Sequence, residues 1–129
     1  LIDGKLDLSD VTWETYSQIE KLAPFGLGNP KPTFLFANVE IDKVRTFGNG
    51  GIHIEIGFKV KGQSINAIGF FTCPPSEDDE DFHEHYSHHF VDVALARGRR
   101  VDLLATFDKS TFGRMPELRL RIVDIRSVV

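Results

Sequence analysis

Cysteine is almost absent from this sequence, and long apolar runs are absent altogether. Cys73 is the only cysteine, which excludes an internal disulfide and fits a reducing compartment, so we expect a cytoplasmic protein. No apolar run approaches the roughly 20 residues of a membrane-spanning helix, and we expect no membrane partner. An initiator methionine is also missing, and the opening Leu1-Ile2-Asp3 predicts an excised fragment of a longer protein.

The composition is that of an ordinary folded domain. The 129 residues are 41% hydrophobic and 26% charged, which suits one domain with a hydrophobic core and excludes a disordered chain. The net charge of −4 disfavours a nucleic-acid partner at first sight. However, residues 74–90 hold six acidic groups and no Lys or Arg, so the rest of the chain has a net charge of +2. A local basic surface is therefore compatible with the acidic total.

Residues 12–22 have the pattern of a short amphipathic helix. Their larger apolar side chains recur at helical spacing, Thr12 is a suitable N-cap, and Pro24 follows as a stop signal. The next residues, PFGLGNPKP at 24–32, combine three prolines with two glycines. Prolines fix φ and remove donors, so this composition predicts a shaped loop rather than a flexible linker.

From residue 34 onward the periodicity becomes that of strands. Leu35, Ala37, Val39 and Ile41 alternate with Phe34, Phe36, Asn38 and Glu40, and this first strand is expected to run to Phe47, with a bend near Gly48. Further strands are predicted over 52–60, 63–71, 101–107 and from 117 onward, with a loop over 108–116. Residues 81–96 have helical spacing, and Gly98 is expected to end that helix.

This order of elements predicts an all-β fold, a five-stranded OB-fold Greek-key barrel with an N-terminal helix. Residues 1–32 would form the leading helix and a docking loop, and residues 33–129 the barrel. A helical insertion over about 74–97 would separate strands three and four.

Several segments carry a family resemblance. PFGLGNPKP, the strand Gly51-Ile52-His53-Ile54, the strand Asn66-Ala67-Ile68-Gly69-Phe70 and the closing strand LRLRIVDIR at 118–126 occur in one order. They resemble the C-terminal OB-fold segment of bacterial RecJ, the single-strand-specific DNA exonuclease family of the DHH phosphoesterase superfamily. Glu55 stands where that family often has a basic residue, Ser110 stands where it often has Asn, and the insertion is longer than the family pattern.

The resemblance implies a single-stranded DNA-binding module of a 5′-to-3′ exonuclease that acts in DNA repair and recombination. Catalysis would lie in upstream domains of the same chain, whose Asp and His clusters hold Mn²⁺ or Mg²⁺. No Asp-His-His triplet occurs here, so we expect this fragment to have no catalytic residue, no metal and no cofactor.

The OB-fold predicts where single-stranded DNA would bind, namely across strands two and three between the loops that flank them. Phosphates need cations and bases need flat rings, and this chain places both there. The candidate binding residues are Arg45, Phe47, His53, Lys59, Lys61, Lys109, Phe112, Arg114, Arg119 and Arg121. For each of them, an ordinary charge or ring on a solvated sheet face is the alternative.

The PFGLGNPKP loop is expected to be structural. It lacks the Gly-Lys-Ser/Thr ending of a phosphate loop, and Phe25 would be a buried plug between the helix and the barrel. The docking residues are Pro24, Phe25, Gly26, Gly28, Asn29 and Pro30. A direct DNA contact through Lys31 or the glycine amides is the alternative.

Two further groups of residues invite a functional interpretation. His85 and His89 lie four residues apart, with His83 and His88 beside them, but a solvent-facing helix flank explains them better than a metal site. The acidic run 77–81 is expected to be a solvated insertion away from the DNA.

A second function remains open alongside DNA binding. The barrel could be a protein-interaction or scaffold module that closes the parent enzyme or docks a partner such as single-strand binding protein. An autonomous metal-dependent enzyme is disfavoured, because no carboxylate pair or nucleophile–base set is evident.

Overall fold

The computed structural model describes residues 2–48, 53–70 and 95–128, and strands dominate them. The chain begins with β1 (Gly4–Lys5), a 3₁₀ turn η1 (Leu8–Asp10) and the helix α1 (Trp13–Glu20). The strands that follow are β2 (Phe34–Glu40), β3 (Lys43–Phe47), β4 (His53–Val60), β5 (Gln63–Gly69), β6 (Arg100–Ser110) and β7 (Glu117–Ser127).

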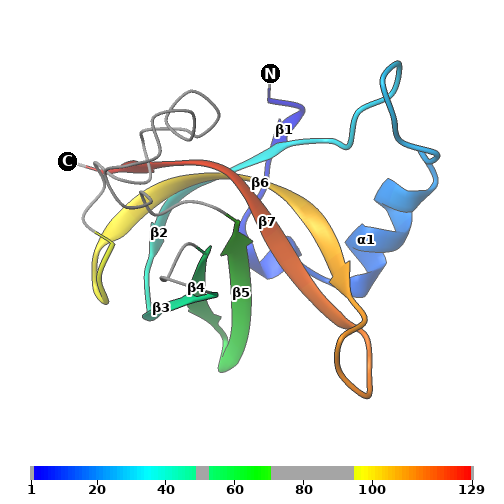
Figure 1. Ribbon diagram of the computed structural model, residues 1–129. Helices are drawn as coiled ribbons and strands as arrows, with labels where there is room; N and C mark the ends of the chain where they lie inside the picture. Colours follow the sequence, from blue (N-terminus) through cyan, green and yellow to red (C-terminus); the bar gives the residue numbers. More distant parts are fainter. Residues whose placement is uncertain (1, 49–52, 71–94, 129) are drawn as a thin grey trace, which may run out of the picture.

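All seven strands form one sheet, which curls round on itself. The order across the sheet is β1-β2-β6-β7-β5-β4-β3. β2 and β3 stand far apart in this order, yet only Ile41 and Asp42 separate them along the chain. The sheet must therefore bend until these two strands meet, as Figure 1 shows. The mostly-β, OB-fold-like architecture agrees with the sequence prediction, although the sheet has seven strands rather than five.

The prediction of one continuous strand over 34–47 is wrong, because the structure has two strands there, β2 and β3. β2 pairs with β6, whereas β3 pairs with β4, so the segment changes partner halfway. The register of β2 shifts between Phe36 and Val39, and Asn38 has a φ of 53°. This bulge reverses the side-chain alternation, so that both Phe36 and Val39 are buried. The chain therefore turns at Asn38 and at 41–42, before the expected bend at Gly48.

Side chains from β6 and β7 hold the bulge at Asn38. The Asn38 amide donates to Asp102 Oδ1 at 2.9 Å, and Arg100 Nη1 donates to the Asn38 carbonyl at 3.0 Å. Arg126 donates to Asp102 Oδ2 through Nη2 at 2.7 Å and through Nε at 3.2 Å. These bonds satisfy the peptide groups that the bulge removes from the ladder.

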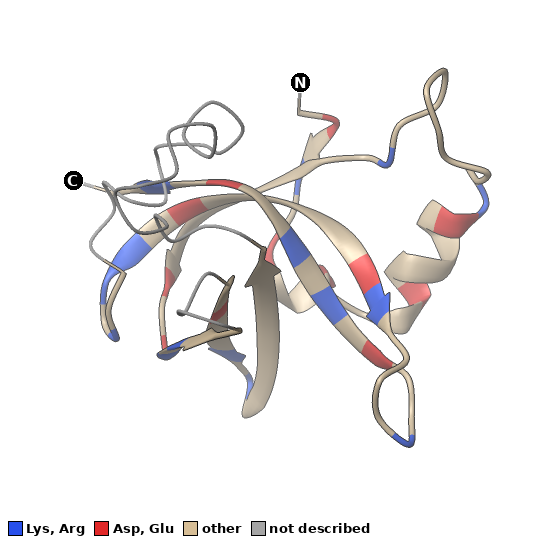
Figure 2. Cartoon of the chain, viewed as in Figure 1, with Lys and Arg blue, Asp and Glu red and all other residues tan. Residues whose placement is uncertain are grey.

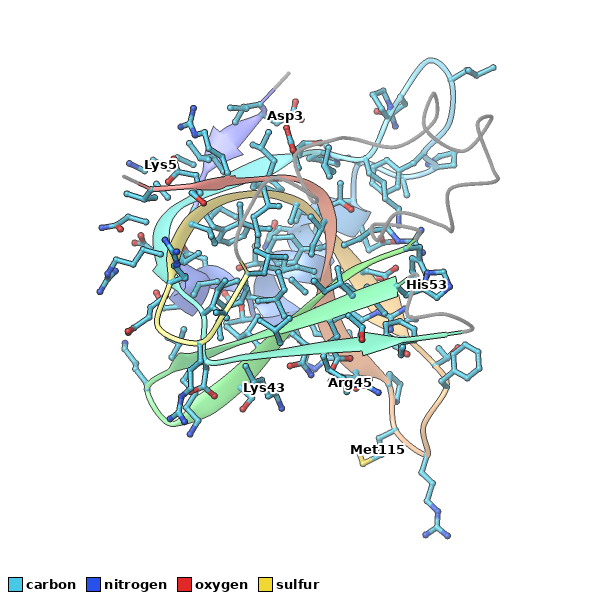
Figure 3. All side chains as sticks on the ribbon, turned by 60° about the vertical axis from the view of Figure 1, so that its left-hand side comes forward. Asp3, Lys5, Lys43, Arg45, His53 and Met115 are labelled. Atoms are coloured by element: carbon cyan, nitrogen blue, oxygen red, sulfur yellow. The ribbon has the colours of Figure 1, made fainter. Side chains whose placement is uncertain are left out.

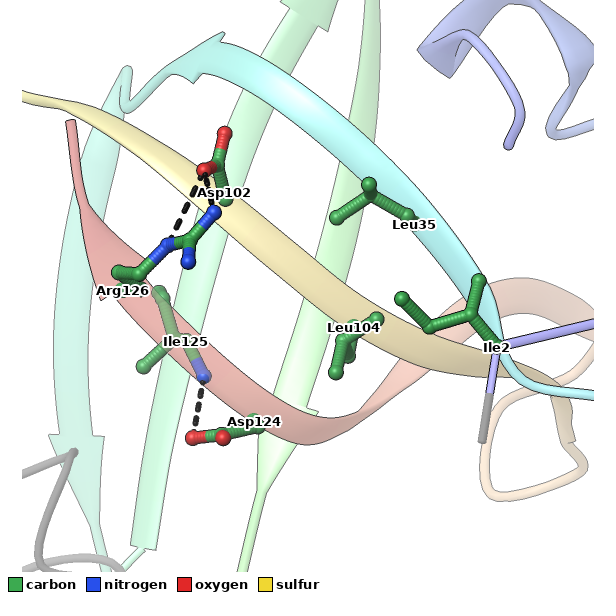
Figure 4. A pocket seen from close by; sticks show the side chains of 7 residues that line it. All are labelled: Ile2, Leu35, Asp102, Leu104, Asp124, Ile125 and Arg126. Carbon is green, nitrogen blue, oxygen red and sulfur yellow. Dashed lines mark hydrogen bonds and ion pairs between the residues drawn. The ribbon is translucent and has the colours of Figure 1, made fainter. Parts of the chain in front are cut away.

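Asp102 and Arg126 also border a pocket of about 150 Å³ on the outside of β2, β6 and β7. Figure 4 shows the pocket with Arg126 turned toward Asp102 and with Asp124 accepting the amide of Ile125. Its apolar lining comes from Ile2, Leu35, Leu104 and Ile125.

The core lies inside the curled sheet. Its largest fully buried side chains are Phe36, Ile41, Ile56, Phe58, Val101, Leu103, Leu120 and Ile125. Ile54, Ile56 and Phe58 of β4 are buried together, as the alternation predicts. β7 also follows its predicted alternation as far as Ile122, and a second bulge there leaves Val123 exposed while both Ile122 and Ile125 are buried.

The N-terminal helix is shorter than the predicted 12–22, and fewer of its apolar side chains pack on the core than the helical spacing predicts. α1 ends at Glu20, and Thr12 caps it by accepting the Thr15 amide at 3.2 Å. Tyr16 and Ile19 pack against the core, whereas Trp13 and Leu22 remain 45% and 57% exposed.

Much of the predicted insertion lies outside the described residues. This applies to the four histidines, the acidic run, Cys73 and most of the helix predicted over 81–96. Of that helix, Leu95 and Ala96 are described and are not helical, and Gly98 forms a turn with a φ of 87°. No helix in the described ranges is long and apolar enough to span a membrane.

Removal of the Asp102 charge should destabilise the fold in a pH-dependent manner. The hydrogen bonds from Arg126 and the Asn38 amide lower the pKa of Asp102. A lowered pKa gives stability that is present above the unfolded-state pKa, about 4, and is lost as pH falls through the folded-state pKa. We expect Asp102→Asn to lower the free energy of unfolding by about 1.5–3 kcal/mol at pH 7, with a smaller difference below pH 4. Urea unfolding at several pH values measures this, with exposed Glu40→Gln as control, and an equal loss at every pH would contradict it.

Asn38 should tolerate glycine better than alanine. Its positive φ suits Asn and Gly, whereas an alanine Cβ costs about 1–2 kcal/mol in that conformation. We therefore expect Asn38→Ala to be less stable than Asn38→Gly, by about 1 kcal/mol, in thermal or urea unfolding. Equal stabilities would show that the bulge does not depend on this residue's backbone conformation.

Candidate nucleic-acid interface

The outer face of β3, β4, β5 and β7 gathers several of the predicted binding residues. Because Ile54, Ile56 and Phe58 point into the core, His53, Glu55, Gly57 and Lys59 of β4 face outward. The register then places Phe47 beside His53, Arg45 beside Glu55 and Lys43 beside Gly57. On the other side of β4, Glu55 is opposite Ile68, which is in turn beside Arg121 of β7.

Three rings form a cluster at one end of this face. The His53 ring centroid lies 5.1 Å from that of Phe47 and 5.0 Å from that of Phe70, and the two phenylalanine centroids are 6.3 Å apart. All three side chains are half-buried, so each keeps part of its surface accessible. We call Phe47, His53 and Phe70 the ring cluster.

An arginine stacks on each phenylalanine of the ring cluster. The guanidinium carbon of Arg45 lies 5.3 Å from the Phe47 centroid, and that of Arg121 lies 4.7 Å from the Phe70 centroid. Both distances are within the range of cation–π attraction. Figure 3 labels Arg45 and His53 on this side of the molecule. The stacking holds the two cations beside flat aromatic surfaces, which is the combination that single-stranded nucleic acids bind.

Two of the predicted cations already have carboxylate partners. Arg45 Nη2 lies 3.3 Å from Glu55 Oε2, and Arg119 Nε lies 2.7 Å from Asp108 Oδ2. The Arg119–Asp108 side chains are only 20% and 18% exposed, whereas Arg45 is 62% exposed. Arg119 is therefore held in a cross-strand ion pair, and Arg45 remains accessible but partly neutralised.

Lys43 and Phe70 lie on this face but are not among the binding residues predicted from the sequence. An added Cβ at Gly57 would meet the Lys43 side chain at 2.6 Å, so the glycine lets Lys43 lie across the β4 backbone. A glycine inside a strand is a known sign of such a close approach. Phe70 follows β5, and its alternation with the buried Ala67 and Gly69 would have placed it on the outer face.

The predicted lysines near the β4–β5 turn lie away from the ring cluster. Lys59 is exposed, and its position in β4 is roughly 20 Å along the strand from His53. Lys61 and Gly62 both have positive φ and make the two-residue turn, as the sequence predicts. Lys61 borders a pocket lined also by Leu8 and Val11 of the N-terminal segment. These lysines can contribute positive charge but no contact with the rings.

The β6–β7 loop is shorter than predicted and fully accessible. β6 continues to Ser110, so Lys109 is an exposed strand residue rather than part of the loop. Phe112 is 100% exposed, Met115 is 79% exposed, and Arg114 is also exposed. Figures 1 and 2 show the loop projecting beyond the end of the sheet, with a basic residue at its tip. The arrangement presents a ring and a cation to solvent.

The predicted docking loop has a defined shape but no buried plug. Asn29 Nδ2 donates to the carbonyls of Leu22 at 2.6 Å and Pro24 at 2.9 Å. Gly26 and Asn29 exchange two backbone hydrogen bonds, of 2.8 and 3.0 Å. Phe25 is half-buried rather than buried, and the other docking residues, Pro24, Gly26, Gly28, Asn29 and Pro30, are exposed.

The side chains on this face are of types that bind flat or anionic groups. The ring cluster, its two arginines and Lys43 offer stacking surfaces and positive charge. Within 2–48, 53–70 and 95–128, no three His, Cys, Asp or Glu side chains come together in a way that would hold a metal ion. The face therefore suits a flat, anionic, flexible ligand.

Comparisons with known proteins agree with the fold and with the motifs. A family profile described as the RecJ OB domain matches residues 2–124. The single-stranded-DNA-specific exonuclease RecJ of Bacillus subtilis (strain 168) is 29% identical over 69 residues, which are 54% of this chain and 9% of that protein. This chain therefore spans a small part of its curated relative.

Solved structures show the same fold. RecJ from Thermus thermophilus, in complex with Mg²⁺, matches with a TM-score of 0.59 and 18% identity, over 96% of this chain and 16% of that chain. A putative aspartyl-tRNA synthetase from Leishmania major Friedlin matches with a TM-score of 0.53 and 12% identity, over 97% of this chain and 20% of that chain. Identities this low carry the fold alone. Because the family profile covers nearly the whole sequence, the chain belongs to the RecJ OB domain family.

Proposed function

We propose that this domain binds single-stranded DNA for a RecJ-like 5′-to-3′ exonuclease and positions the strand for catalytic domains elsewhere in the same polypeptide. The observation that carries the proposal is the ring cluster with Arg45 and Arg121 stacked on it. The relative's name, a single-stranded-DNA-specific exonuclease, supports the choice of ligand.

The proposed mechanism combines stacking with phosphate attraction. A base would lie against the exposed surfaces of the ring cluster, where each stacked base is worth about 1–3 kcal/mol. Arg121 and Lys43 would attract the neighbouring phosphates, and Phe112 and Arg114 would contact the strand farther along. Such binding tolerates many sequences, because every base has a flat face, and it weakens with salt.

Hydrolysis would belong to the rest of the parent enzyme. The divalent ions of the reaction, Mn²⁺ or Mg²⁺, would be held by residues outside this chain. In this arrangement the enzyme is cytoplasmic and acts in DNA repair and recombination. The domain itself would hold the DNA strand and take no part in its hydrolysis.

A protein-interaction or scaffold role is the second candidate. The net charge of −4 and the fully exposed Leu27 favour it. In that case the domain would close the parent enzyme or dock a partner such as single-strand binding protein. Pull-down of a partner that persists after nuclease treatment and requires the domain would support this role.

The outer face should determine DNA affinity. We expect the domain to bind a fluorescent oligothymidine at low salt. The affinity should fall as salt rises, and the logarithm of the association constant should change with the logarithm of the salt concentration by about −0.7 for each phosphate contact. Phe112→Ala combined with Arg121→Gln should weaken binding by about 1–3 kcal/mol, because a stacking surface and a phosphate contact are lost. Fluorescence anisotropy measures both effects.

The control variant for this experiment is Lys5→Gln, which removes an exposed positive charge on β1, at the other end of the sheet order. It should bind like the parent domain. Equal binding by the double variant would place the DNA elsewhere, and no binding at low salt would favour the protein-interaction role.

Glu55 should weaken DNA binding, because it lies in the middle of the proposed face and neutralises Arg45. We expect Glu55→Gln to tighten binding at low salt by up to about fivefold, which corresponds to at most ~1 kcal/mol for an exposed ion pair. The gain should shrink at high salt, where exposed charges are screened. Glu40→Gln, an exposed carboxylate on β2, is the matched control, and equal gains in the two variants would show that only net charge matters.

A further inference from the structure

The segment from Leu22 to Asn29 is held rigidly at the surface by Asn29. The side-chain amide of Asn29 bonds to the carbonyls of Leu22 and Pro24, and its backbone pairs with Gly26. The tip that these bonds form is therefore ordered before anything binds to it. A preformed loop loses little conformational entropy on association.

The tip carries residues that the domain itself does not explain. Leu27 is 109% exposed, so it contributes nothing to the core. A Cβ added at Gly26 or Gly28 would meet no atom of the described residues within 4 Å, and neither glycine has a positive φ. In the described part of the chain, neither close packing nor backbone conformation requires glycine at these positions. Glycines of this kind suit a backbone that another surface approaches closely.

Further apolar surface lies on this segment and on the helix that precedes it. Leu22, whose carbonyl accepts the Asn29 bond, is 57% exposed, and Trp13 of α1 is 45% exposed. Single exposed apolar residues are ordinary, whereas Leu22 and Leu27 both lie on the one segment that Asn29 holds, which suggests an interaction site. In Figure 1 this segment lies near the top of the molecule and β3 lies in its lower half, and Figure 3 labels Lys43 and Arg45 in the lower half as well.

We propose that Leu22–Asn29 is a docking element whose anchor, Leu27, enters an apolar pocket on another domain of the same polypeptide. An aliphatic anchor cannot stack on bases, so a protein surface fits it better than a nucleic acid. The part of the parent protein outside this chain is the partner to which the proposal commits, because the chain spans 9% of one relative and 16% of another. The proposal rests on the proposed function only in treating this domain as a module of a larger enzyme.

Hydrogen exchange in the full-length protein and in the isolated domain tests the docking directly. We expect the amides of residues 22–30 to exchange about tenfold or more slowly in the full-length protein, because the partner excludes water from the tip. Leu27→Asp in the full-length protein should return the exchange rates to those of the isolated domain. Equal rates in the two unmodified proteins would overturn the proposal.

A glycine variant separates docking from folding. Gly26→Ala combined with Gly28→Ala should leave the thermal midpoint of the isolated domain unchanged or slightly raised, since both Cβ positions are open. In the full-length protein the same variant should lose the slow exchange. Loss of stability in the isolated domain would mean that the glycines serve its own fold, and would overturn the inference.

Met115→Ser provides the matched control, because it changes an accessible apolar residue on the other projecting loop. It should leave exchange at residues 22–30 as in the unmodified protein. Protection that appears in the isolated domain as its concentration rises would assign the tip to a second copy and overturn the choice of partner. Oligothymidine binding by the isolated domain is measured separately, so failure of DNA binding and failure of docking give different results.

Discussion

The bulge at Asn38 is the constraint on which this domain depends. One continuous segment must pair with β6 at its start and with β4 at its end, although these strands lie far apart in the sheet. The chain achieves this by placing Asn38 in the left-handed region and by supplying its peptide groups with bonds from Asp102 and Arg100. Arg126 of β7 then holds Asp102, so three strands share one small polar network. Without this turn, β3 would not reach β4, and Phe47 would not lie beside His53.

The proposed binding face is a consequence of that closure. Phe47 comes from β3, His53 from β4, Phe70 follows β5, and Arg121 comes from β7. Four separate strands must be in register before these side chains meet. Rigid strands position such groups more accurately than loops, and the arginines lose little freedom because the rings already support them. The accessible β6–β7 loop would add a less constrained contact beyond the end of the sheet.

The domain has two functional ends under this interpretation. The ring cluster and its cations suit a flexible anionic strand, whereas the rigid tip with Leu27 suits an apolar protein surface. Separate surfaces would let the domain stay attached to a catalytic body while its other face holds DNA. The carboxylate of Glu55 limits the positive charge of the proposed binding face, which would weaken its attraction for a DNA strand.

The sequence by itself determined the strand-rich class, the order of most elements and the family, because periodicity, turn residues and motifs are local. The N-cap at Thr12, the alternation in β4 and the turn at Lys61-Gly62 are short-range features of this kind. Only the tertiary structure decided where the first strand breaks, which arginines are neutralised and which rings meet. The break depends on Asp102, 64 residues away from Asn38 along the chain, and the neutralisation of Arg119 depends on Asp108 of the neighbouring strand. Such partners are set by register between strands that are far apart in the chain, and no local pattern specifies that register.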